Sequence, residues 1–189
     1  MKKRRVMVEE YKNQMGIYTI TINNARYCKN CINKILKSYL KDKTIFLGLY
    51  RIDGMNLSAK AMKELKTKIP LFFQKYGDVQ NLNEHLTIAN ICLNDTSYDF
   101  FSDIFDYYLD TIVFNPKIDW KTFKQYYSNY QEHRLEDMIL NHLAEVLFCY
   151  SDSGDFSICF SSEFYSCTNI KNMISKVLLE EGFSEATIK

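Results

Sequence analysis

Two apolar segments near residue 150 place the tightest limit on the fold of this chain. Residues 146–150 and 156–161 read VLFCY and FSICFS, and the linker between them contains Gly154. Glycine readily adopts the positive φ angle that a tight turn requires, so the two segments are predicted to form a β-hairpin. In the second segment, large apolar residues alternate with serine and cysteine, which indicates one core-facing and one more polar face.

Periodicity elsewhere predicts strands alternating with helices. Strands are expected at 16–23, 44–52 and 86–93, with a short one after Gly182, and helices at 29–42, 58–76, 95–112, 120–130, 135–143 and 169–181. The most economical architecture is α+β or open α/β, with a mixed sheet of five to six strands and about six helices packed on it. No internal repeat is evident.

The length of 189 residues suits a single domain spanning 1–189. Within it, residues 1–15 are expected as a polar, basic tail, 16–93 as a basic βαβαβ half and 94–189 as an acidic half of helices and a hairpin. The charge supports this division, because residues 1–75 hold 17 basic and 5 acidic side chains, whereas residues 76–189 hold 7 and 18. The two halves are expected either to neutralise each other or to present surfaces of opposite charge.

An acidic stretch dominates the second half. Between Lys75 and Lys117 no Lys or Arg occurs, and five aspartates recur at spacings of three or four: Asp95, Asp99, Asp103, Asp106 and Asp110. At about 100° per residue, all five fall on one side of a helix, and apolar residues fall on the other. Like charges one turn apart repel and destabilise a helix, so a functional or structural role is needed to explain this face.

Three interpretations of the aspartates remain open. The face is solvated or neutralised by the basic half, it binds divalent cations, or it recognises a basic partner. Five carboxylates over 15 residues span about 22 Å, a scale comparable to the phosphates of DNA, so such a ridge can act as a nucleic-acid mimic. Tyr107 lies at its edge and suits a protein interface. The expected partner-binding residues are therefore the five aspartates and Tyr107.

Motifs for catalysis are weak. The CxxC pair Cys28–Cys31 has no second pair to complete a zinc site and lacks the residues usual in a thioredoxin centre, so packing is favoured over redox or metal chemistry. No nucleophile elbow or glycine-rich phosphate loop occurs, so no cofactor is expected and an enzyme is the less favoured class.

These observations favour a small cytoplasmic binding protein, without a membrane segment, that neutralises a basic partner such as a nuclease toxin or a nucleic-acid-handling enzyme. Immunity proteins, antitoxins and phage-encoded inhibitors share that physical task. The first alternative is a nucleic-acid-binding accessory protein that uses the lysine-rich N-terminal half. The second is a metal-dependent enzyme centred on the aspartates.

Overall fold

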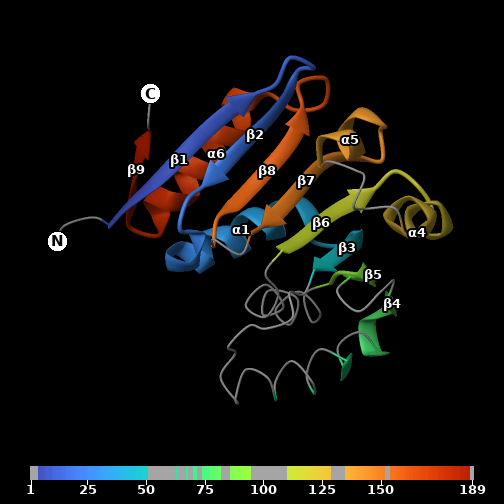
Figure 1. Ribbon diagram of the computed structural model, residues 1–189. Coiled ribbons are helices and arrows are strands. Elements are labelled where there is room, and N and C mark those ends of the chain that lie inside the picture. Colours follow the sequence, from blue (N-terminus) through green and yellow to red (C-terminus); the bar gives the residue numbers. More distant parts are fainter. Residues whose placement is uncertain are drawn as a thin grey trace.

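The fold is organised around one mixed sheet. The computed structural model describes residues 4–50, 63, 67, 70–71, 74–81, 86–94, 110–128, 135–151 and 154–187. Within these residues nine strands form the sheet in the order β4-β5-β3-β6-β7-β8-β2-β1-β9 (Figure 1). Every neighbouring pair is antiparallel except β1 and β9, which run parallel.

The strands have the following bounds: β1 Arg4–Lys12, β2 Ile17–Ile22, β3 Thr44–Tyr50, β4 Gly77–Asn81, β5 Leu86–Cys92, β6 Asp110–Pro116, β7 Ala144–Tyr150, β8 Phe156–Ser161 and β9 Phe183–Thr187. The helices are the short 3-10 helix η1 Ala25–Cys28 and the α-helices α1 Lys29–Leu40, α4 Trp120–Ser128, α5 Leu135–Leu140 and α6 Cys167–Glu180. None of the helices in the described ranges is long and apolar enough to cross a membrane.

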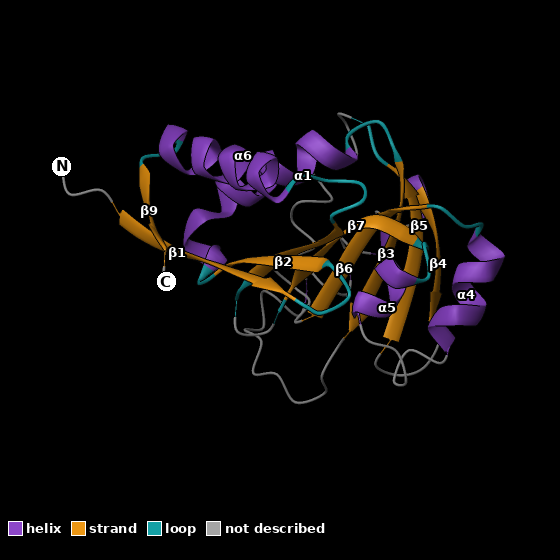
Figure 2. Ribbon diagram, turned by 90° about the horizontal axis from the view of Figure 1, so that it is seen from above, coloured by secondary structure: helices purple, strands orange, loops and turns teal. Residues whose placement is uncertain are grey.

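Helices lie on both faces of the sheet and create two cores. Helices α1 and α6 cover one face, while α4 and α5 lie on the other (Figure 2). The larger core joins α1 and α6 to the sheet through fully buried residues such as Ile35, Ile158 and Ile174. The smaller core joins α4 and α5 to the opposite face around Phe123 and Phe114. On that second face, α5 packs against β7 and β8.

The predicted fold class was wrong in its numbers of strands and helices. The sheet has nine strands instead of five to six, and the described residues contain fewer helices than the six expected. Strand β1 lies where a tail was expected, and its signal is the alternation of buried Val6 and Val8 with charged neighbours. Strands β4 and β6 were also missed. The short β4 gains its stability from its partner β5, and the start of β6 was assigned to a helix because of its aspartate spacing.

Several local predictions were confirmed. The hairpin exists as β7–β8, and Gly154 has a φ of 82° at its turn. Helix α4 begins after Asp119, whose carboxylate accepts a hydrogen bond of 2.9 Å from the backbone N–H of Thr122. Helix α6 ends before Gly182, which has a φ of 80°.

An internal repeat, which the sequence conceals, relates two parts of the sheet. The hairpin β1–β2 leads through η1 and α1 to β3, and the hairpin β7–β8 leads through α6 to β9. Equivalent residues differ by the same 138 positions, as in 13 and 151, 16 and 154, or 29 and 167 at the helix starts. Both turns contain the same hydrogen bond of 3.0 Å, from Asn13 to Ile17 and from Ser151 to Asp155. The prediction that no repeat exists is therefore corrected.

The two repeats meet at the pairing of β2 with β8. Ile20 lies opposite its own equivalent, Ile158, so the repeats are related by an approximate two-fold axis at this pair. They differ in one respect, because β6 separates β7 from β3 whereas β9 lies directly against β1. Identity survives at only a few buried or turn positions, such as Ile32 and Ile170, because packing requires apolar character more than a particular residue.

Candidate interaction surface

The predicted acidic face is only partly described. Asp95, Asp99, Asp103, Asp106 and Tyr107 lie outside the described residues, so their role stays a prediction. Asp110 is the first residue of β6, and its backbone lies opposite Tyr50 of β3. The expected helix over 95–112 is thus wrong for its last three residues. The β-branched run that follows Asp110 favours a strand, and β6 is hydrogen-bonded by β3 on one side and β7 on the other.

The Cys28–Cys31 pair has the environment of packed thiols. Both side chains are buried at the start of α1. Burial, together with the neighbouring Cys31, raises the pKa of Cys28 to about 12, and burial also raises the pKa of Cys31. Both thiols therefore carry little of the thiolate that redox chemistry and metal binding use. Across the described ranges, no three His, Cys, Asp or Glu side chains gather closely enough to hold a metal ion.

The lysines of α1 are engaged within the chain. Lys34 forms a salt bridge with Glu181 and lies 3.8 Å from Glu180, both from the C-terminal half. Lys29, Lys37 and Lys41 also have interactions inside the molecule. Lys171 of α6 binds Glu10 of β1 at 2.8 Å, a pair whose cation comes from the C-terminal half and whose anion comes from the N-terminal half. The two charged halves thus neutralise each other in part, which weakens the case for α1 as a nucleic-acid surface.

A different surface lies around the β1–β2 turn and combines polar and apolar residues, and we call it the turn corner: Tyr11, Met15, Ile17, Ile139, Leu140, His142, Ser161, Glu163 and Phe164. The exposed fractions of Tyr11, Met15 and Phe164 are 62%, 60% and 44%, which is unusual for large apolar residues. Except for Tyr11, all of these residues line a cavity of about 210 Å³. Figure 1 shows the β1–β2 turn, the end of β8 and α5 at this same end of the molecule.

Local backbone geometry positions the cavity walls. His142 has a φ of 55°, which reverses the chain between α5 and β7, and its ring meets Phe164 edge-on with centroids 6.4 Å apart. After β8, the backbone N–H of Glu163 donates to the Ser161 hydroxyl at 3.2 Å, and that of Phe164 donates to the Ser161 carbonyl. The segment after β8 is joined to the β1–β2 turn, because the N–H of Ser162 donates to the Gly16 carbonyl at 3.4 Å.

The turn corner suits a basic side chain. Glu163 supplies a carboxylate in the cavity wall, and Met15 and Phe164 supply apolar surface beside it. Lysine and arginine carry a charge on an aliphatic stem, so one end can pair with the carboxylate while the stem contacts the apolar rim. An arginine can additionally stack on the ring of Phe164.

Sequence reasoning missed this surface entirely. Its residues come from a turn, a helix end and a strand end that are far apart in the chain, and only pairing of β2 with β8 brings them together. The available signals were Met15 in a polar turn and the aromatic Phe164 directly after Glu163, at positions with no periodic reason to be apolar.

Comparison with known proteins found no matching family model, no matching curated protein and no matching solved structure.

Proposed function

We propose that this protein is a small binding protein that neutralises a basic protein partner and docks through the turn corner. The observation that carries the proposal is the cavity whose lining combines Glu163 with the exposed Met15 and Phe164. Methionine and aromatic residues are enriched at protein interfaces, and a carboxylate within an apolar rim selects a cationic side chain.

The charge distribution supports a basic partner. Residues 76–189 hold 18 acidic and 7 basic side chains, so this half attracts a cationic protein over distances beyond direct contact. The proposal retains the predicted acidic stretch at Asp95, Asp99, Asp103 and Asp106 as a second contribution to association. A partner that handles nucleic acid, such as a nuclease toxin, has the required cationic surface. The cellular role is then that of an immunity protein, an antitoxin or a phage-type inhibitor.

A cytoplasmic location belongs to this proposal. All six cysteines are free, which suits a reducing compartment.

The test is recovery of the partner from the native host, followed by measurement of its dissociation constant with matched variants. Glu163→Lys places a cation in the cavity, and Phe164→Ala removes the apolar rim. Each is expected to weaken binding by about tenfold or more, because each removes a contact at the centre of the interface. Glu180→Lys makes the same charge reversal near the C-terminal end of α6 and is expected to have a much smaller effect.

A separate variant distinguishes the two acidic regions. Replacement of Asp99, Asp103 and Asp106 by Asn tests the acidic stretch without changing the turn corner, and is expected to slow association more than it speeds dissociation. If the partner binds Glu163→Lys and Phe164→Ala as tightly as it binds the unmodified protein, docking at the turn corner is refuted. If the recovered partner is acidic, the whole proposal is refuted.

A further inference from the structure

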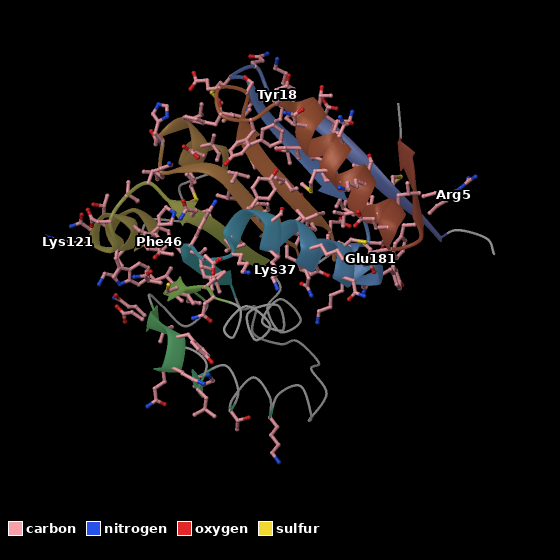
Figure 3. All side chains as sticks on the ribbon, turned by 180° about the vertical axis from the view of Figure 1, so that it is seen from behind. Arg5, Tyr18, Lys37, Phe46, Lys121 and Glu181 are labelled. Atoms are coloured by element: carbon pink, nitrogen blue, oxygen red, sulfur yellow. The ribbon has the colours of Figure 1, made fainter. Side chains whose placement is uncertain are left out.

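A second cavity lies at the opposite end of β1 from the turn corner. Its volume is about 530 Å³, within the roughly 300–1,000 Å³ typical of small-molecule sites. The side chains that matter for recognition are Arg5, Val6, Asn23, Asn24, Tyr27 and Phe183, all of which line it. Figure 3 shows Arg5 at the same end of the molecule as Glu181 and far from Tyr18, and its side chain extends outward from the edge of the sheet.

The cavity exists because β2 ends opposite Val8, so the first residues of β1 have no β2 residues beside them. The antiparallel ladder ends with the pair Val8 and Ile22, followed by a hydrogen bond of 3.0 Å from the Asn23 N–H to the Met7 carbonyl. Asn24 then adopts a φ of 54° and turns the chain into η1. Main-chain groups of alternate residues point to the same side of a strand, so the N–H and C=O of Arg5 point the same way as the Met7 carbonyl. Among the described residues, no strand pairs with Arg5 on that side.

The chemistry of the lining is cationic and apolar. Arg5 carries the charge, Asn23 and Asn24 carry amides, and the ring of Tyr27 is 66% exposed. None of the described lining residues is acidic. Two carboxylates at this end of the molecule have partners within the chain, because Asp155 accepts a hydrogen bond of 2.7 Å from the Asn24 N–H and Glu181 binds Lys34. Tyr27 also has Arg26 over its ring, 5.7 Å from the centroid, which adds positive charge to this wall.

The internal repeat relates this cavity to the turn corner. Asn23, Asn24 and Tyr27, at the end of β2, correspond to Ser161, Ser162 and Tyr165, at the end of β8, again 138 positions later. Asn23 lines one cavity and its equivalent Ser161 lines the other, and the two linings also contain Arg5 and Glu163, respectively. The repeated element supplies two sites of opposite charge.

We propose that this second cavity binds a carboxylate carried on an aromatic or other apolar body. The carboxylate pairs with the Arg5 guanidinium and main-chain N–H, and the body contacts Tyr27 and Phe183. Arginine is the side chain that best matches the planar geometry of a carboxylate. Two sources carry this chemistry: the C-terminal residue of a peptide and a small aromatic acid.

The experiment is an NMR titration of the full ¹⁵N-labelled chain with N-acetylphenylalanine and with its amide. Binding of the acid is expected to shift the backbone amides of residues 5–7 and 23–27, and the amide analogue is expected to bind about tenfold or more weakly because it lacks the charge. A tripeptide that ends in phenylalanine, with either a free or an amidated C-terminus, distinguishes the two sources. Tighter binding of the free tripeptide identifies a peptide terminus, whereas tighter binding of the acid identifies a small molecule.

Matched variants locate the contacts. Arg5→Ala and Tyr27→Ala are expected to weaken binding by about tenfold or more. Lys12→Ala removes a cationic side chain from the far end of β1 and is expected to leave binding unchanged. Equal binding of acid and amide, loss of binding in the Lys12 variant equal to that in the Arg5 variant, or no shift of these amides at millimolar ligand overturns the proposal. Shifts of the same amides by oligothymidine but not by the carboxylates overturn it in favour of nucleic acid.

Discussion

At the scale of single residues, burial decides what the cysteines can do. Cys28 and Cys31 form a motif that in other surroundings supports redox chemistry, but both are buried behind the start of α1. Because the pKa of Cys28 is raised from 9.0 to about 12, its thiolate fraction near pH 8 is about a thousandfold lower than that of an ordinary thiol. Cys92, by contrast, is exposed.

We therefore expect a thiol reagent such as DTNB at pH 8 to modify Cys92 much faster than Cys28 or Cys31 in the native protein. Mass spectrometry of the modified peptides identifies the sites. In 8 M urea the burial is lost, and all six cysteines are expected to react at similar rates. Rapid modification of Cys28 in the native state would contradict the packing interpretation.

At the scale of elements, the two hairpin turns share the same backbone geometry, with a glycine of positive φ at equivalent positions. Gly16 and Gly154 have φ angles of 78° and 82°, and each turn is closed by equivalent backbone hydrogen bonds. A side chain at either position is strained by this backbone conformation. The turns also contact the other repeat, since a Cβ on Gly154 would lie 3.4 Å from the Arg26 Nε and one on Gly16 would lie 3.5 Å from the Ser162 Oγ.

Alanine at either glycine is expected to lower the free energy of unfolding by about 1 kcal/mol or more, and by similar amounts at the two sites. Urea denaturation followed by circular dichroism measures the change. Gln14→Ala lies in the first turn at a residue without a positive φ, and is expected to change stability by about 0.5 kcal/mol or less. A Gly154→Ala variant as stable as the unmodified protein would contradict this account of the turns.

At the scale of the whole molecule, the pairing of β2 with β8 joins the two repeats into one sheet. Ile20 and Ile158 face each other across it, and both are fully buried in the larger core. A side-chain hydrogen bond also links the two strands, because the hydroxyls of Thr21 and Ser157 lie 2.9 Å apart. The repeats share one core, so neither is expected to stay folded when the other unfolds.

Ile20→Ala and Ile158→Ala are each expected to cost about 2–5 kcal/mol, because each leaves a cavity at the centre of the core. Unfolding should remain a single transition, with Trp120 fluorescence from α4 and far-UV circular dichroism changing together. The double variant should show coupling, since the two side chains are cross-strand neighbours. Separate transitions for the two signals would show that the repeats fold independently.

The periodic elements were predictable from the sequence, and the elements that depend on partners were not. Alternating or apolar runs predicted β2, β3, β5 and the β7–β8 hairpin, and amphipathic spacing predicted α1 and α6 within a few residues. These patterns are local consequences of which face of an element is buried. By contrast, β1 is rich in charged residues and β4 is short, and both depend on neighbouring strands. Asp110 belongs to a strand because β6 pairs with β3 on one side and β7 on the other.

Tertiary structure alone decided the repeat and both cavities. The repeat is encoded in strand register and turn geometry, which tolerate almost any apolar residue in the core, so little sequence identity remains to reveal it. The cavities arise where β2 and β8 each end, and their walls come from segments up to about 180 positions apart, from Arg5 to Phe183. The sequence by itself determined the alternation of buried and exposed faces. Which faces and ends meet depended on how nine strands pair in one sheet.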